Sequence, residues 1–150
     1  MKRTGLIKAA AVLCVASLLA CWCSVAAELQ DKKPQQTKPR RYGSVIGLRA
    51  EKLAEYKKLH AAVWPAVAKQ IEQANIRNYS IYLRKLPDGD FYLFSYFEYV
   101  GDDFQADMAK MAADASTKKW WKVTDPCQQP LADRKPGEWW ASMEEVFHQD

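Results

Sequence analysis

The chain after residue 41 predicts an α+β domain whose elements follow the order β-α-β-β-α-β, the ferredoxin-like pattern. Three observations support this order. A helical segment follows a short first strand, two strand-like segments flank a strong turn signal, and a second helical region precedes a last strand. Such an order gives an antiparallel sheet with its helices on one face. The 110 residues from Arg41 to Asp150 are the size of one small domain.

The first strand and the first helical region are expected between residues 42 and 74. Tyr42–Leu48 alternates loosely and carries β-branched residues, which predicts a strand. The segment Arg49–Ala74 is rich in Ala, Lys, Glu and Leu, which favour helices. Pro65 should divide it into two helical pieces, because proline is well tolerated as the first residue of a helix. Asn75 is expected to close this unit.

A hairpin is expected next. Ile76–Lys85 and Phe91–Val100 are rich in aromatic and β-branched residues, which favour strands. Between them stands Pro87-Asp88-Gly89-Asp90, a strong turn signal. The two segments should therefore pair as antiparallel neighbours.

Two more helices are expected after the hairpin. The first should begin at Asp102 or Asp103 and run to about Ala115. Ser116 is a candidate N-cap for the second, which should run to about Val123.

The C-terminal part should be a loop followed by the last strand. Residues 124–140 contain three prolines and a glycine, which predicts a loop, and Ala141–His148 should form the strand. Cys127 lies in this loop, and its neighbours provide no base or cation that would activate a thiol. We expect a small, partly buried structural thiol there, although a nucleophile is the alternative.

The strand Phe91–Tyr99 poses a packing problem, because both of its alternating sets of residues are largely apolar or aromatic. A half-exposed antiparallel strand would alternate between apolar and polar residues. With helices on one face, the other face should meet a partner or enclose a cavity. A homodimer whose two sheets face each other satisfies this, and a small-molecule pocket would then lie beside the sheet. A plain aromatic core without a ligand is the alternative.

The N-terminus predicts export. A basic start, the apolar run Ala9–Ala20 and small residues ending at Ala27 form a secretory signal, residues 1–27, that lies outside the fold. Cleavage after Ala27 would release a soluble periplasmic or extracellular protein. Cleavage before Cys21 would leave a lipid-anchored one, since Leu18-Leu19-Ala20-Cys21 resembles a bacterial lipoprotein signal. We favour the soluble form.

The net charge does not indicate a nucleic-acid partner. The chain has 22 basic and 18 acidic residues, and removing residues 1–27 leaves 19 and 18. Residues 28–41 hold a basic, Pro- and Gln-rich segment that is expected to be a flexible linker. No aromatic residue interrupts its basic run to stack on a base. The domain itself therefore begins at about residue 42.

The segment Tyr56–Pro65 holds the main candidate for catalysis. On a helix, the spacing of four places Tyr56, His60 and Trp64 on one face, together with apolar residues of a buried stripe. Imidazole is the side chain that titrates near neutral pH, so His60 could transfer protons, although an ordinary packed histidine fits the pattern equally well. No spacing of histidines and cysteines suggests a metal site, and no cofactor motif is present.

Aromatic side chains indicate a class of ligand. Indole and phenol rings combine a flat apolar face with a hydrogen-bonding edge, which suits a sugar ring with C–H groups on its faces and hydroxyls around its rim. The pair Trp120-Trp121 is flanked by lysines, so both rings are not expected to be fully buried. From composition alone, sugar binding and core packing are equally good interpretations of the pair.

These residues also resemble a known family, the L-rhamnose mutarotases, over nearly all of residues 41–148. The matching positions are Tyr56, His60, Trp64-Pro65, Asn78-Tyr79, Ile81-Tyr82-Leu83, Trp120-Trp121, Thr124-Asp125 and Glu145-Val146-Phe147. The resemblance implies a dimeric α+β barrel that interconverts the α and β anomers of L-rhamnose. It makes His60 the counterpart of the proton donor. It also makes Tyr56, Tyr79, Trp120 and Trp121 counterparts of sugar-contacting residues.

Two features differ from the better-known members. Those enzymes are cytoplasmic, whereas this chain carries a secretion signal, and its segment 125–140 is a distinct version of the C-terminal loop. We therefore keep three hypotheses: an exported aldose mutarotase (an isomerase of the racemase and epimerase class) that needs no cofactor, a non-catalytic sugar-binding module, and a monooxygenase of the dimeric-barrel type. The third is only a fold analogy.

Overall fold

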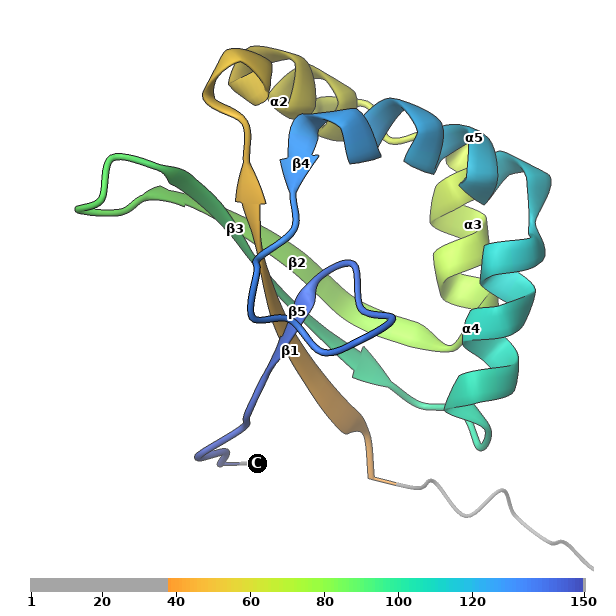
Figure 1. Ribbon diagram of the computed structural model, residues 1–150. Coiled ribbons are helices and arrows are strands. Elements are labelled where there is room, and N and C mark those ends of the chain that lie inside the picture. Colours follow the sequence, from red (N-terminus) through yellow and green to blue (C-terminus); the bar gives the residue numbers. More distant parts are fainter. Residues whose placement is uncertain (1–37, 150) are drawn as a thin grey trace, which may run out of the picture. The chain divides into compact units, whose positions relative to one another are not determined.

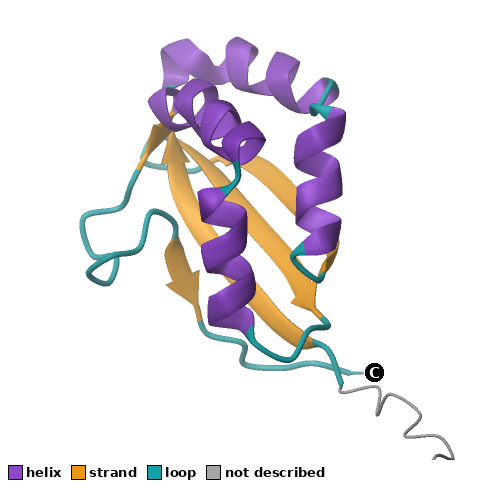
Figure 2. Cartoon of the chain, turned by 90° about the vertical axis from the view of Figure 1, so that its right-hand side faces the viewer, coloured by secondary structure: helices purple, strands orange, loops and turns teal. Residues whose placement is uncertain are grey.

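Residues 38–149, which the computed structural model describes, form a curled antiparallel sheet with helices on one face (Figure 1; Figure 2). The strands follow the order β2-β3-β1-β4, and β5 also pairs with β1. This arrangement confirms the predicted α+β, ferredoxin-like class. The strands are β1 (Arg40–Leu48), β2 (Ile76–Lys85), β3 (Phe91–Tyr99), β4 (Gln128–Gln129) and β5 (Ala141–Met143).

The helices occupy the expected regions. They are η1 (Ala50–Lys52), α2 (Leu53–Ala61), α3 (Pro65–Gln73), α4 (Phe104–Ala113), α5 (Ala115–Thr124) and η2 (Asp125–Cys127). No helix among these residues is long and apolar enough to cross a membrane. The predicted signal, residues 1–27, the possible anchor at Cys21 and residues 28–37 of the predicted linker lie outside the described residues. The linker was predicted to run to residue 41, but β1 already begins at Arg40.

The first helical region is divided into two helices, as the sequence predicted, with His60 near the end of the first. Pro65 is the first residue of α3, as predicted, while α2 already ends at Ala61. Trp64 has an extended backbone and is the N-cap of α3. The prediction that Tyr56, His60 and Trp64 share one helix face was therefore wrong for Trp64, because the residue before a proline is driven out of helical geometry.

Aspartates cap the second helical region. The Asp103 carboxylate accepts a hydrogen bond from the Ala106 amide at 3.0 Å, as expected for the start of α4. Asp114, and not the predicted Ser116, caps α5, since its carboxylate accepts from the Thr117 amide at 2.7 Å. A carboxylate at a helix N-terminus adds a favourable charge–dipole interaction that a serine hydroxyl lacks.

The core lies between the sheet and α2. Its buried members are Ile46 and Leu48 of β1, Leu93 of β3, Tyr56 of α2 and Cys127 of η2. Burying a side chain such as Ile46 or Leu93 contributes about 1.5–3 kcal/mol. This cluster fixes α2 on the sheet, and with it the segment that carries His60.

A β-bulge in β2 decides which side chains face the helices. The hairpin pairs Arg77 with Glu98 but Ser80 with Tyr96, so two residues, Asn78 and Tyr79, stand opposite one position of β3. Asn78 adopts a left-handed backbone with φ 50°, which asparagine tolerates better than most residues. A bulge of this kind re-aims the residues that follow it. Tyr79 consequently faces the helices rather than the outer side of the sheet.

Asn75 ends the α3 unit, as predicted, and helps to hold α4. Its backbone is left-handed, with φ 59°. Its side-chain amide donates to the Asp107 carboxylate at 2.8 Å, and the Tyr99 hydroxyl donates to the same carboxylate at 2.8 Å. These bonds join α4 to the end of β3.

The last strand is much shorter than the predicted Ala141–His148. Only Ala141–Met143 pair with β1, and the predicted loop contains η2 and the short strand β4. Beyond β5 the tail is held by an ion pair between Arg41 and Glu145 at 3.0 Å. Val146 and Phe147 remain 89% and 79% exposed. Within the single chain, these apolar side chains find no surface that would extend the strand.

Candidate functional site

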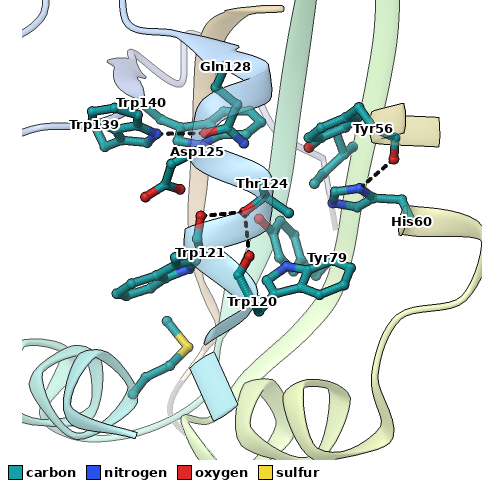
Figure 3. A pocket seen from close by; sticks show the side chains of 12 residues that line it. Tyr56, His60, Tyr79, Trp120, Trp121, Thr124, Asp125, Gln128, Trp139 and Trp140 are labelled. Carbon is teal, nitrogen blue, oxygen red and sulfur yellow. Dashed lines mark hydrogen bonds between the residues drawn. The ribbon is translucent and has the colours of Figure 1, made fainter. Parts of the chain in front are cut away.

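A cavity of about 410 Å³ opens between the helices, β2 and the segment that precedes β5 (Figure 3). This volume is in the range of small-molecule sites. It brings together all five residues that the sequence nominated: Tyr56, His60, Tyr79, Trp120 and Trp121. The other lining residues are Ile81, Met111, Thr124, Asp125, Gln128, Trp139 and Trp140.

His60 projects from the last turn of α2 and has a defined orientation. Its ring stacks on Tyr56 with the ring centres 4.0 Å apart, and Nδ1 lies 3.0 Å from the Tyr56 carbonyl oxygen (Figure 3). A carbonyl only accepts, so Nδ1 carries the proton and donates. In the neutral ring, Nε2 is then an unprotonated acceptor. Partial burial lowers the pKa of His60 below its usual 6.5, so the neutral form predominates at pH 7.

Tyr56 contributes a hydroxyl group without a hydrogen-bond partner among the described residues. The side chain is only 4% exposed, and burial is the main cause that raises its pKa. A buried polar group is rarely left unpaired, because each such group costs about 1–3 kcal/mol. The hydroxyl group itself is buried, and the Gln128 side chain, which also lines the cavity, is close enough to lower its pKa and partly offset the effect of burial.

The two tryptophans of α5 have different surroundings. Trp120 is buried, and its indole meets His60 and Trp64 edge-on, each with ring centres 5.3 Å apart. Trp121 is 37% exposed. The expectation that both rings would not be fully buried is confirmed. Trp120 thus fixes the position of the imidazole, while Trp121 offers an accessible indole at the cavity.

Tyr79 enters the site because of the bulge in β2. Its ring meets Phe97 edge-on at 5.8 Å between centres. The residue is 43% exposed as a whole, yet burial around its phenol raises its pKa. The side chain therefore presents an apolar ring and a hydroxyl group from the sheet side of the cavity.

Seven lining residues were not nominated as site residues from the sequence, and four of them, Asp125, Gln128, Trp139 and Trp140, come from the C-terminal segment 125–140. Trp139 donates from its indole nitrogen to the Gln128 side-chain oxygen at 2.6 Å, which holds the loop against η2 and β4 (Figure 3). Asp125 belonged to a motif noted in the sequence, and Trp139-Trp140 is a second tryptophan pair. These were the available signals, but the proline-rich segment around them predicted only a loop.

A second cavity, of about 460 Å³, adjoins the first. The two share His60, Tyr79, Ile81 and Trp120, and the second is completed by Val63, Val67, Ala68 and Ile71. The imidazole therefore stands between an aromatic cavity with polar groups and a largely aliphatic one. A ligand at His60 could place an apolar substituent on the aliphatic side.

Cys127 is a structural residue. It is completely buried, and its thiol points to the Val123 carbonyl oxygen at 3.6 Å. Burial raises the pKa of this thiol, which disfavours the nucleophilic thiolate. In residues 38–149, no group of three or more His, Cys, Asp or Glu side chains is arranged to hold a metal ion.

One oriented imidazole among indoles and phenols, on a ferredoxin-like sheet, defines a small acid–base site for a compact polar ligand. Comparison with known proteins gives the family. Residues 41–149 match the sequence model of the L-rhamnose mutarotases (rhaM), and the chain belongs to that family. This confirms the resemblance found in the sequence.

Individual relatives cover the same part of the chain. It is 34% identical to the L-rhamnose mutarotase of Lactiplantibacillus plantarum over 73% of this chain and 98% of that protein. It is 31% identical to that of Oceanobacillus iheyensis over 74% of this chain and 99% of the relative. The crystal structure of the enzyme from Formosa agariphila superposes with a TM-score of 0.55 at 23% identity, covering 74% and 99% of the two chains, which supports the fold.

Proposed function

We propose that this protein catalyses the interconversion of the α and β anomers of L-rhamnose, as an isomerase of the racemase and epimerase class. The observation that carries the proposal is the orientation of His60, whose Nε2 is left as an acceptor because Nδ1 donates to the Tyr56 carbonyl. Membership of the family provides the sugar. The sugar-binding module and the monooxygenase are the less favoured alternatives.

Mutarotation needs two proton transfers at the anomeric centre. Opening breaks the C1–O5 bond and forms the C1=O1 bond. The proton of O1 passes to Nε2 of His60, and O5 receives a proton from water or from a donor of the cavity. After rotation about C1–C2, closure on the other face of C1 reverses both transfers, and the imidazolium returns its proton to O1. No proton is consumed overall, and His60 acts as acceptor and donor in turn.

The cavity supports the binding of a deoxy sugar. Tyr56 and Tyr79 provide hydroxyl groups, while Trp120 and Trp121 provide flat apolar faces. The adjoining aliphatic cavity suits the C6 methyl group, since its neighbours at Val67 and Ile71 carry no polar atoms. L-Rhamnose, which has a methyl group and several hydroxyl groups, matches both sides.

The decisive experiment measures anomer exchange by magnetisation transfer between the two anomeric proton signals. The protein should accelerate exchange of L-rhamnose above the enzyme-free rate, with smaller effects in a panel of other aldoses. Saturable quenching of tryptophan fluorescence without faster exchange would instead favour the sugar-binding module. Colour after addition of haem, or oxygen uptake with a quinol, would favour the monooxygenase.

A homodimer is proposed on separate grounds. The face of the sheet away from the helices carries exposed Tyr82 and Met143, and the tail adds Val146 and Phe147. Several exposed large apolar side chains on one chain are typical of a subunit interface. Light scattering after size-exclusion chromatography should give twice the mass of one chain, and Phe147→Asp should shift the protein toward the monomer. A monomeric wild-type protein would contradict the dimer.

Export, with a soluble mature form, also remains a proposal, and it is supported by the sequence of residues 1–27. Mass spectrometry of the mature protein distinguishes the two possible forms. Cleavage after Ala27 should leave Glu28 as the first residue. A lipid modification at Cys21 that disappears in the Cys21→Ser variant would instead show an anchored form. An uncleaved chain would contradict export.

A further inference from the structure

We infer that Asp125 is a substrate-binding residue that accepts hydrogen bonds from two neighbouring hydroxyl groups of the sugar on the side remote from its anomeric carbon. The inference rests on the proposed function, which places the anomeric carbon at His60. It assigns a role to a residue that the sequence did not nominate.

The first argument is the state of the Asp125 side chain. It is partly buried and lines the cavity, yet no hydrogen bond or ion pair within residues 38–149 engages its carboxylate. Partial burial alone raises its pKa, and no neighbouring donor or cation offsets this effect. A carboxylate accepts up to four hydrogen bonds, so this group carries unused capacity at a site where a ligand can reach it.

The second argument is the position of Asp125 in the fold. It follows the last residue of α5 and is the first residue of η2, and its side chain makes no capping hydrogen bond at either helix among the described residues. Partial desolvation without a partner is costly. The structure therefore offers no stabilising reason for a carboxylate here, which favours a role in ligand binding.

The third argument is the geometry of the cavity. Figure 3 shows Asp125 at the end of α5 close to Trp121 and Trp139, whereas His60 enters from α2 on the other side. A pyranose with its C1–O5 bond at His60 presents its C3 and C4 hydroxyls toward the opposite wall. Adjacent hydroxyls can each donate to one oxygen of the same carboxylate. The flanking indoles would cover the apolar faces of the sugar ring.

The inference predicts selectivity for sugars that carry both hydroxyl groups. The probes are L-rhamnose, 3-deoxy-L-rhamnose and 4-deoxy-L-rhamnose, with anomer exchange measured over a range of sugar concentrations. Asp125→Asn should lower kcat/KM for L-rhamnose by about tenfold or more, mainly through KM, because it removes a charged acceptor. The loss should be several-fold smaller for each deoxy sugar, which cannot make both hydrogen bonds.

Two controls separate binding from folding. Asp102→Asn makes the same chemical change at an exposed carboxylate that does not line the cavity, and it should leave kcat/KM unchanged. The melting temperature of Asp125→Asn should equal or exceed that of the wild type, because the replaced charge is not stabilising. If the variant fails to fold, the three sugars are compared with the wild-type protein alone. Equal kcat/KM values for L-rhamnose and both deoxy sugars would then overturn the inference.

The results also distinguish the two proposals. Unchanged kcat/KM in Asp125→Asn, or equal losses for all three sugars, would overturn the role of Asp125 and leave the mutarotase proposal intact. If the wild type accelerates no exchange, the mutarotase proposal fails. Tryptophan quenching by L-rhamnose then tests Asp125 directly, and equal dissociation constants for wild type and Asp125→Asn would overturn its role.

Discussion

Replacing His60 by alanine tests the chemistry of the site most directly. His60 is the one imidazole that lines the main cavity within the described residues. The substitution removes the Nε2 acceptor and leaves Tyr56 and both tryptophans of α5 in the chain. Binding and catalysis should therefore respond differently to this change.

The expected magnitudes follow from the surroundings of His60. A positioned acid–base group contributes about 10²–10⁴-fold to a rate, so most of the acceleration should disappear. The fold should be little affected. Losing the stacking contact with Tyr56, at 4.0 Å between ring centres, costs about 0.5–1.5 kcal/mol. Replacing histidine by alanine stabilises α2 by up to about 0.7 kcal/mol, because alanine has the higher helix propensity. Losing the hydrogen bond from Nδ1 to the Tyr56 carbonyl costs about 0.5–1.5 kcal/mol more, so the free energy of unfolding should fall by about 1–2 kcal/mol and the variant should stay folded.

The assay is magnetisation transfer between the anomeric protons of L-rhamnose, with the enzyme-free rate subtracted. Fluorescence titration measures sugar binding by the same variant, and urea unfolding measures its stability. His60→Gln keeps much of the side-chain volume and should be equally inactive, while Lys57→Ala on the same helix, an exposed residue, should behave like the wild type. A folded His60→Ala variant with wild-type exchange would refute the assignment of proton transfer to this residue.

Four further predictions concern the pH profile and the surrounding framework. Because burial lowers the pKa of His60 and the unprotonated Nε2 is the acceptor, kcat/KM should rise with pH through an apparent pKa below 6.5 and level off near pH 7; activity that falls from pH 5 to 7 would contradict this. Asn78→Val should destabilise the protein by about 1–3 kcal/mol in urea unfolding, since a β-branched residue is strained at φ 50°, whereas Asn78→Gly should differ little from the wild type; equal stabilities would count against strain in the bulge. Ile71→Thr should reduce the preference for L-rhamnose over L-mannose, its 6-hydroxy counterpart, in kcat/KM ratios, and an unchanged ratio would exclude the aliphatic cavity from recognition. Gly47→Ala should lower activity although residue 47 lies outside the main cavity, because its added methyl group would stand 2.8 Å from the Gln129 carbonyl oxygen and displace β4; wild-type exchange rates would show that β4 tolerates the shift.

The regular parts of the fold could be predicted from local sequence. Pro87–Asp90 gave the hairpin turn, and Pro65 gave the first residue of α3, because both depend on backbone preferences of a few neighbouring residues. The proximity of Tyr56 and His60 could also be predicted from the sequence, since a spacing of four on one helix brings side chains together regardless of the rest of the fold.

Other features depend on contacts that local sequence does not reveal. The bulge at Asn78 and Tyr79 is defined only by the register against β3, and the alternation of β2 alone does not show it. The tail after Met143 has the composition of a strand, but an extended segment becomes a strand only where an edge and a covering surface are available. Val146 and Phe147 lack that cover within one chain.

The cavity wall opposite His60 contains lining residues that were not nominated from the sequence. It comes from residues 125–140, whose prolines exclude long helices and strands, so no periodic pattern marks the inward-facing side chains. Their positions depend instead on single contacts: β4 approaches β1 closely only because residue 47 is a glycine, and Gln128 next to it then binds Trp139 at 2.6 Å. A substitution at Gly47 would thus displace the backbone of β4 and thereby change the shape of the cavity. In the proposed mechanism, proton transfer depends on a residue of α2 and sugar recognition on the loop 125–140, so that substitutions in the loop could change the sugar contacts without moving the imidazole.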